Sequence, residues 1–171
     1  MTDRVKAACD LVVLCADLCQ QKVIEVLLGK RAKSLGIRKI KFDIIKAPLG
    51  DSDVRAHWET YLQPYYRVAR HCLVIFDWEG CGVEQQAAEP ARLEEELEEC
   101  INAKAARAGR TNWASVIAIQ PELEIWAWTN SPHVPRALGF ERMSYDGLRR
   151  KLRGRFPKYW SKDSDKPLRP K

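Results

Sequence analysis

Three short apolar runs, each followed by acidic side chains, constrain the fold of this chain more than any other feature. The runs cover residues 11–16, 72–76 and 116–119. Continuous apolar runs of this length are typical of strands that are buried on both faces of a parallel sheet. The segments between them place apolar residues three or four apart, which predicts helices. We therefore expect an α/β fold with a mostly parallel central sheet flanked by helices.

The connecting segments support this reading. Helices are predicted over residues 19–33, 54–68 and 90–108, because apolar side chains recur there at helical spacing. Pro64 should kink the second of these helices or mark where two shorter helices meet. Over residues 37–47, Ile and Phe alternate with Arg and Lys, which predicts a second, less buried strand. The order of elements is then strand, helix, strand, helix, strand, helix, strand.

Size and composition narrow the class of protein. A chain of 171 residues is the length of one ordinary domain, and no apolar run approaches the roughly 20 residues of a membrane-spanning helix. The apolar stretch near the start is too short for a secretory signal, and no small-residue cleavage pattern follows it. The six cysteines form no CxxC pair, so we expect reduced thiols. These features predict a cytoplasmic protein with no membrane partner.

The C-terminal end of the chain is basic. Residues 136–171 hold 12 Lys or Arg against four acidic residues, whereas the first 135 residues carry a net charge of −2. Ser144 can cap a short final helix, and weak order is expected after Phe156. Phosphates attract such a segment, so it predicts a nucleic acid or another phosphorylated partner, although a solvated basic tail is the alternative. The candidate nucleic-acid-binding residues are Arg149, Arg150, Lys151, Arg153, Arg155 and Lys158.

Acidic residues follow three of the predicted strands. Asp17 follows the first apolar run, Asp77 and Glu79 follow the second, and Glu122 and Glu124 follow the third. In open parallel sheets, ligands bind at the carboxyl ends of the strands, where these side chains should meet. Converging carboxylates repel one another unless a cation neutralises them, and Mg²⁺ or Mn²⁺ prefers oxygen ligands. All five are therefore candidate metal ligands, with capping of a helix as the alternative for Asp17 alone.

The spacing of the paired acids refines this hypothesis. Residues 77 and 79, like residues 122 and 124, project the same way if the chain remains extended, so both members of a pair could reach one ion. Such an ion could activate a water for in-line displacement at phosphorus, which phosphodiester hydrolysis requires. Asp17, Asp77 and Glu79 are the candidate catalytic residues.

Two segments resemble motifs of a known superfamily. The residues at 74–82, Val-Ile-Phe-Asp-Trp-Glu-Gly-Cys-Gly, and at 121–128, Pro-Glu-Leu-Glu-Ile-Trp-Ala-Trp, resemble the TOPRIM-type domains of topoisomerases, primases and OLD-family nucleases. More closely, the chain is similar to small stand-alone bacterial proteins of that superfamily, some encoded with methylation-associated phage-defence systems. The resemblance covers about residues 11–140, and residues 166–171 resemble the start of a basic C-terminal motif of that group.

The resemblance implies a Rossmann-like TOPRIM-type domain over residues 1–140, followed by a basic helix and tail over residues 141–171. It places the family's paired acids on Asp77 and Glu79 and its final acidic motif on Glu122 and Glu124. Two departures stand out: the family's usual Glu after the first strand is absent, with Asp17 as the nearest substitute, and its usual Asp-x-Asp is here Asp-Trp-Glu.

Two functions follow as hypotheses. The first is a Mg- or Mn-dependent nuclease or phosphoryl-transfer protein that acts on nucleic acid in bacterial antiviral defence. The second is a non-catalytic TOPRIM-like subunit that binds partner proteins of a defence complex or nucleic acid. Trp126 and Trp128 are expected to serve packing rather than base stacking, and Tyr159 and Trp160 are better placed to stack on an exposed base or to meet a partner.

Overall fold

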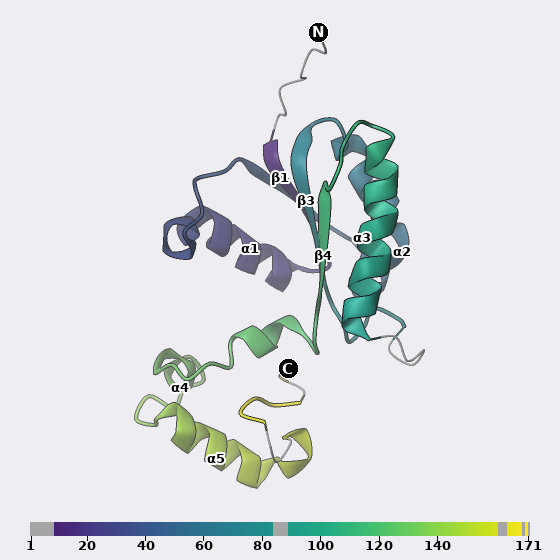
Figure 1. Ribbon diagram of the computed structural model, residues 1–171. Coiled ribbons are helices and arrows are strands. Elements are labelled where there is room, and N and C mark those ends of the chain that lie inside the picture. The colour runs from purple at the N-terminus through teal and green to yellow at the C-terminus, as the bar shows by residue number, and fades with distance from the viewer. Residues whose placement is uncertain (1–8, 84–88, 161–163, 169, 171) are drawn as a thin grey trace. The chain divides into compact units, whose positions relative to one another are not determined.

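The computed structural model describes residues 9–83, 89–160, 164–168 and 170 (Figure 1). The chain forms two compact units, Met1–Ile119 and Gln120–Lys171. This division lies earlier in the chain than the boundary expected at residue 140. Each unit is described here by itself.

The first unit is built on a four-stranded sheet in the order β2-β1-β3-β4, in which every pair of neighbours is parallel. The strands are β1 (Cys9–Cys15), β2 (Phe42–Lys46), β3 (Ala69–Asp77) and β4 (Ala114–Ile119). The three apolar runs are thus strands, as predicted. β2 lies at one edge and is less buried, also as predicted, although it begins later than the alternating pattern indicated.

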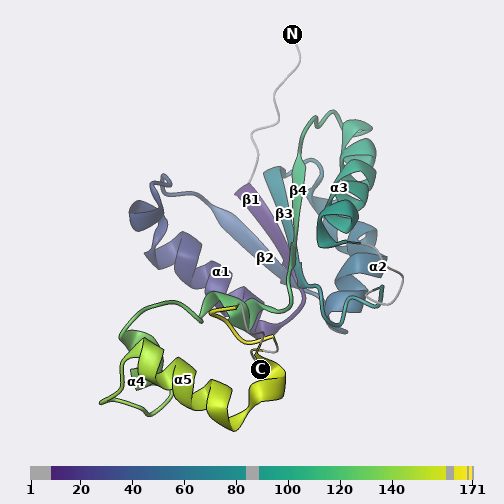
Figure 2. The same ribbon diagram turned by 60° about the horizontal axis from the view of Figure 1, so that its bottom comes forward.

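Helices cover both faces of this sheet (Figures 1 and 2). Helix α1 (Leu18–Lys30) lies on one face, and α2 (Asp51–Leu62) and α3 (Pro90–Ala106) lie on the other. Short 3-10 helices follow the first two, η1 (Ala32–Leu35) after α1 and η2 (Gln63–Tyr65) after α2. Pro64 therefore lies where one helix gives way to another, as its ring geometry predicts.

The main core lies between the sheet and the pair α2 and α3. Alternate residues of the strands point into it, among them Leu14 of β1 and Phe76 of β3, and Ile101 of α3 meets them. Trp113 packs edge-on against Tyr66, with ring centroids 5.1 Å apart, and is almost fully buried. Burial of such large apolar side chains is the main source of the stability of this unit.

Side chains of helix α3 also bind backbone N–H and C=O groups on the outer side of β4, the free edge of the sheet. On the outer side of β4, the Val116 N–H donates to Glu98 (3.2 Å) and the Ala118 N–H donates to Glu94 (2.7 Å). One turn further along α3, the Asn102 amide binds both the N–H and the C=O of the first residue of β4. Three side chains spaced four residues apart therefore occupy hydrogen-bonding groups that an exposed edge strand would offer to another strand.

The second unit consists of short helices and a C-terminal segment that the structure describes at residues 164–168 and 170. The helices are η4 (Leu123–Trp126), α4 (His133–Ala137), α5 (Tyr145–Arg155) and η5 (Pro157–Tyr159). Ser144 caps α5 by accepting a hydrogen bond from the Gly147 N–H, as predicted. The expectation of weak order after Phe156 is wrong for the described residues, because Trp160 is buried and pairs with Pro167.

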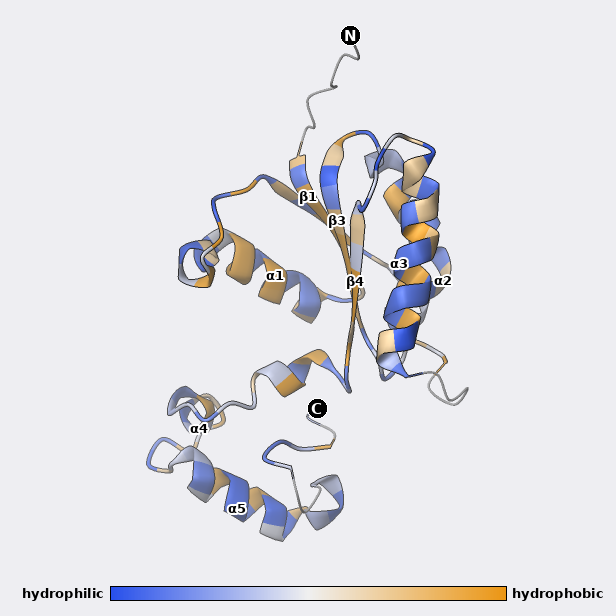
Figure 3. Ribbon diagram, in the orientation of Figure 1, coloured by the Kyte–Doolittle hydropathy of each residue, from blue (hydrophilic) through white to orange (hydrophobic). Residues whose placement is uncertain are grey.

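The two units differ visibly in hydropathy. Figure 3 shows apolar strands in the first unit and a mostly hydrophilic α5 in the second. Among the described residues, no helix is both long and apolar enough to span a membrane.

The cysteines are free thiols, and Cys15 and Cys72 are buried. Burial raises the pKa of the Cys15 thiol to about 11, so this side chain behaves as a small hydrophobe rather than as a nucleophile.

Candidate site at the carboxyl edge of the sheet

The carboxyl edge of the sheet has the topology of a ligand site. The chain leaves β1 to form β2 on one side and later returns to form β3 on the other side of β1. In open α/β sheets, ligands bind at such a switch point, beyond the carboxyl ends of the two diverging strands. Here Asp17 follows β1, and Asp77 is the last residue of β3. Asp51, the first residue of α2, follows β2 at the same edge.

A buried glutamine connects these acids. Gln20 has no exposed surface. Its Oε1 accepts a hydrogen bond from the Ala16 N–H (2.8 Å), and its Nε2 donates to Asp51 Oδ1 (3.2 Å) and to Asp77 Oδ1 (3.1 Å). The two N–H groups of the amide are thus both used on carboxylates. The Gln20 side chain therefore fixes the positions of two acids that come from different elements.

Asp17 joins the same network through the backbone. It is the N-cap of α1, and its Oδ1 accepts a hydrogen bond from the Gln20 N–H (2.8 Å). The alternative reading of Asp17 as a helix cap is therefore correct, and the cap lies next to the other acids. A carboxylate also suits this position because the N-terminus of a helix carries partial positive charge.

The surroundings of Asp51 raise the pKa of its carboxyl. Burial raises the pKa of its carboxyl, and the negative charge of Asp17 adds to that effect. Hydrogen bonds to Oδ1 from Gln20 and from the Asp77 backbone N–H (2.7 Å) act in the opposite direction. Gly80 passes close to Asp51, since an added Cβ would lie 3.4 Å from Asp51 Oδ2, and its φ of +103° also favours glycine.

Glu79 does not project as an extended chain would place it. The chain bends at Trp78 and turns at Glu79, so the assumption that residues 77 and 79 share one direction is wrong. Asp77 is 1% exposed and Trp78 is 8% exposed, whereas Glu79 is only partly buried. The Trp78 N–H donates to the carbonyl of Ile119 (2.8 Å), which lies opposite Asp77 in the sheet register. This pairing holds the turn at the sheet edge.

Glu122 and Glu124 belong to the second unit. Glu122 is extended and precedes η4, and Glu124 lies within η4, so the extended geometry assumed for this pair is also wrong. Both side chains are partly buried. The structure thus brings Asp17 and Asp77 together within the first unit, and it describes Glu122 and Glu124 in their own unit.

The fit of a metal ion at the sheet edge is partial. The carboxylates of Asp51 and Asp77 supply the oxygen donors that Mg²⁺ or Mn²⁺ prefers, but the Gln20 amide nitrogen lies between them. Within the described parts of the chain, no group of three or more His, Cys, Asp or Glu side chains is arranged to hold a metal ion. Coordination by both acids would require the Gln20 amide to turn so that its oxygen, rather than its nitrogen, faces the ion.

The candidate nucleic-acid-binding residues lie on or just after α5 in the second unit. The six side chains are Arg149, Arg150, Lys151, Arg153, Arg155 and Lys158. Arg149 pairs with Asp165 and, at 3.4 Å, with Asp146. Lys151 lies 4.9 Å from the centre of the Phe140 ring, and the last two residues of the set also lie over aromatic rings. Most of this set is exposed.

Two residues of the sheet-edge network were missed as site residues. Asp51 lies in the turn-forming stretch after β2, and its position after a strand matches that of the other acids. The signal for Gln20 is weaker, because a polar residue in the first turn of an amphipathic helix is normally exposed. Its partners lie 31 and 57 residues further along the chain.

Comparison with known proteins gives no relative: no family model, no curated protein and no solved structure matches this chain. The structure by itself shows an α/β unit with a four-stranded parallel sheet.

Proposed function

We propose that this chain is a Mg²⁺- or Mn²⁺-dependent nuclease or phosphoryl-transfer protein that acts on nucleic acid, in the antiviral role that the TOPRIM-like resemblance implies. The observation that supports this proposal is the gathering of Asp17, Asp51 and Asp77, from three successive strand ends, around one residue at the switch point of the sheet, since Gln20 donates to Asp17 through its backbone N–H and to the other two through its side-chain amide. Carboxylates are seldom buried together unless something compensates their charge.

The residues of the site would take separate roles. Asp51 and Asp77 would hold the ion, together with Asp17 and Glu79 of the same unit. When bound, such an ion supplies charge neutralisation and an activated water at neutral pH. Asp17 could accept the proton of that water, since the carboxylate is already oriented by the α1 N-terminus. The basic residues of α5 would hold the phosphate backbone.

A metal titration tests the site before any activity is sought. An ion that binds only the folded chain raises the unfolding midpoint, and the rise grows with the logarithm of the ion concentration once that concentration exceeds the Kd. We expect millimolar Mn²⁺ or Mg²⁺ to raise the midpoint of the wild type, and Asp77→Asn to abolish that shift. Glu99→Gln, which removes an exposed carboxylate from α3, is the matched control and should keep the shift.

Nicking of plasmid and single-stranded substrates tests the activity itself. The wild type should cut in the presence of Mn²⁺ or Mg²⁺, and Asp77→Asn should not. Equal cutting by the two proteins would exclude the sheet-edge site as the source of the activity.

The position of Gln20 favours a second candidate function, a non-catalytic subunit that binds defence proteins or nucleic acid. Because the Gln20 amide already donates to both Asp51 and Asp77, the two carboxylates are satisfied as a purely structural polar network. The absence of any midpoint shift at millimolar metal, combined with retained nucleic-acid binding, would favour this function over the first.

A further inference from the structure

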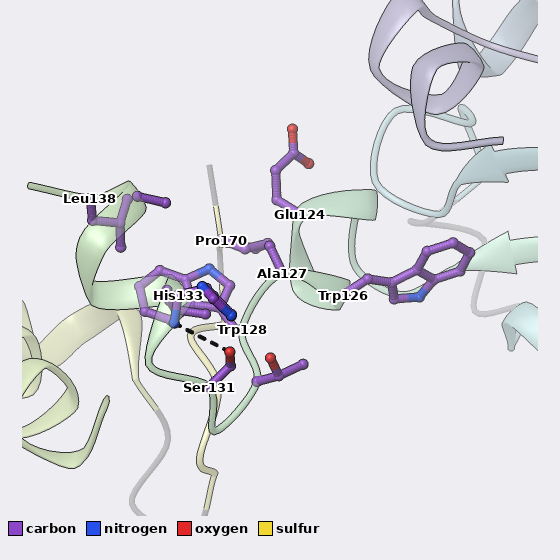
Figure 4. Close-up of a pocket in the computed structure, with 11 residues that line it drawn as sticks. Glu124, Trp126, Ala127, Trp128, Ser131, His133, Leu138 and Pro170 are labelled. Carbon is purple, nitrogen blue, oxygen red and sulfur yellow. Dashed lines mark hydrogen bonds between the residues drawn. The ribbon is translucent and has the colours of Figure 1, made fainter. Parts of the chain in front are cut away.

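The second unit contains a hollow of about 450 Å³ with aromatic walls (Figure 4). Trp128 and His133 contribute rings to its lining, and Leu138 adds an apolar surface from the end of α4. Trp126 also lines the hollow, but its indole points away from these two rings. The volume falls within the roughly 300–1,000 Å³ typical of small-molecule sites. All of its lining residues belong to the second unit, so the hollow exists without any contribution from the sheet.

The walls of the hollow are held in place by contacts behind them. Trp128 meets the buried Trp160 edge-on, with ring centroids 5.6 Å apart and planes at 90°. The Lys166 Nζ donates to the carbonyl of Ile125 (3.3 Å), which ties the C-terminal segment to η4. At the start of α4, the His133 N–H donates to Ser131 Oγ (3.3 Å), as Figure 4 shows. A preformed wall loses little conformational entropy when a ligand binds.

The lining is chemically suited to a flat ring with polar edges. Indole and imidazole rings stack on planar π-systems, and base–aromatic stacking contributes about 1–3 kcal/mol per base. Polar acceptors stand at the same hollow, namely the carboxylate of Glu124 and the hydroxyl of Thr129. A carboxylate can accept a hydrogen bond from the exocyclic amine of a base.

A second hollow adjoins the first and offers cationic groups. It shares Trp128 and Thr129 with the aromatic hollow and is also lined by Arg149 and Lys166. The Arg149 Nε is buried and has no hydrogen-bond partner in the described part of the chain. An unsatisfied buried donor costs about 1–3 kcal/mol, so an acceptor that reached it would be favoured. A phosphate oxygen is such an acceptor.

Two acids also line the adjoining hollow, and both pair with Arg149. The distance from Arg149 to Asp146 is 3.4 Å, and the side chain of Asp165 is 82% exposed. An exposed partner can move aside at little cost, because exposed ion pairs contribute only about 0–1 kcal/mol. The second unit as a whole carries 12 Lys or Arg against six acidic residues, so its field attracts a polyanion.

We propose that the aromatic hollow binds one base of a single-stranded nucleic acid and that the phosphate next to this base lies at Arg149. The proposal deepens the proposed function and rests on it for the class of substrate. It does not depend on the metal, because no residue of the sheet edge lines either hollow.

Oligonucleotide binding in EDTA tests the proposal without the metal. The probe is a fluorescein-labelled ten-nucleotide DNA or RNA strand, followed by anisotropy at fixed salt. Trp128→Ala should weaken binding about tenfold, in line with the stacking of one base. The matched control is Phe156→Ala, because Phe156 is an aromatic residue of the same unit that is 42% exposed and lies outside the hollow. The control should bind like the wild type.

A second variant remains informative if Trp128→Ala disturbs folding through its contact with Trp160. Leu138 is 48% exposed at the hollow, so Leu138→Arg should fold normally while filling the space. Charge alone would make this variant bind a polyanion more tightly, whereas occlusion of the hollow makes it bind more weakly. Weaker binding supports the base site. Tighter binding by Leu138→Arg, or wild-type binding by a folded Trp128→Ala, overturns it, as does a wild type that binds no strand at low salt.

The two proposals can fail separately. Oligonucleotide binding that depends on Trp128, together with no metal shift in the unfolding midpoint, would leave the base site and remove the nuclease. Metal-dependent cutting by a protein whose oligonucleotide affinity is unaffected by Trp128→Ala and by Leu138→Arg would leave the nuclease and remove the base site.

Discussion

The two compact units divide burial and charge very unequally. Residues 1–119 hold 17 Lys or Arg and 17 Asp or Glu, so they are formally neutral, whereas residues 120–171 hold the whole net charge of +6. Of the largest fully buried side chains, Leu148 alone lies in the second unit among the described residues. The comparison indicates that the sheet unit supplies stability and a fixed arrangement of carboxylates, while the smaller unit supplies attraction for a polyanion.

The largest expected effect compares two phenylalanines, one from each unit. Phe76 is fully buried in the sheet core, and Phe76→Ala should lower the free energy of unfolding by about 3–5 kcal/mol. Phe156 is 42% exposed in the second unit, and Phe156→Ala should change it by less than about 0.5 kcal/mol. Urea denaturation followed by circular dichroism measures both. Similar losses would break the assignment of stability to the first unit.

Gln20→Ala should come next in size. The change leaves the Ala16 N–H without its acceptor, and it leaves the buried Asp77 and the partly buried Asp51 without a shared donor, which should cost about 2–3 kcal/mol. Gln21→Ala removes the neighbouring amide, which binds Glu25 near the surface, and should cost much less. If the sheet edge binds metal, Mg²⁺ should raise the midpoint of Gln20→Ala more than that of the wild type, because the amide nitrogen no longer lies between the acids.

Removal of the α3 side chains that accept hydrogen bonds from the free edge of β4 should have the third largest effect on stability. Replacing both Glu94 and Glu98 by Ala leaves two edge N–H groups open, with an expected loss of about 1–2 kcal/mol. The exposed edge should also recruit other copies of the chain. Light scattering after size-exclusion chromatography would show this as a rise in mass. Replacement of the exposed Glu95 and Glu99 is the control, and an unchanged mass for the first variant would contradict the role of α3.

Asp51→Asn should have a smaller effect, and its sign depends on pH. Burial raises the pKa of the Asp51 carboxyl in the folded chain. The contribution of this group to the free energy of unfolding is therefore fully present below the ordinary Asp pKa near 4, and it is lost as the pH rises through the raised pKa. Asparagine keeps an oxygen that accepts the same hydrogen bonds without this loss. The variant should therefore gain stability over the wild type between pH 3 and pH 7 in metal-free buffer. A difference that is constant with pH would contradict the assignment.

The smallest expected effect is on the salt dependence of binding to a single-stranded oligonucleotide, measured for two variants that each lack one exposed arginine. Arg150→Ala, on α5, should reduce the slope of log affinity against log salt by about 1. Arg92→Ala removes the same charge from α3 of the neutral unit and should leave the slope unchanged. Each substitution should alter the free energy of unfolding by less than about 0.5 kcal/mol. Equal slopes for the two variants would mean that the charge of the second unit does not direct binding.

The parts of the fold that could be predicted depend on local patterns. The apolar runs of β1, β3 and β4 and the spacing of apolar residues in α3 each reflect burial of the segment itself. The contacts that could not be predicted join distant parts of the chain. Gln20 reaches Asp77, 57 residues away, and Trp160 orders the C-terminal segment by meeting Trp128. No periodicity within either segment signals such a contact.

For the candidate site, the sequence could predict only which acids lie at the carboxyl ends of strands. Asp17 and Asp77 could be expected at one edge because parallel strands align their carboxyl ends. Their paired partners could not be oriented in advance. Glu79 and Glu124 were assumed to continue an extended chain, and the turn after β3 and the 3-10 helix η4 instead redirect them. Turn geometry depends on contacts such as that of Gly80 with Asp51.

The pairing of Ile119 with Asp77 has a consequence for how the units could cooperate. Ile119 is the final residue of the first unit, so the covalent tether to the second unit starts on the strand next to Asp77, whatever orientation the second unit adopts. A short tether of this kind typically gives an effective local concentration on the order of millimolar. A strand captured by the second unit would therefore meet the carboxylates far more often than a strand that arrives by free diffusion.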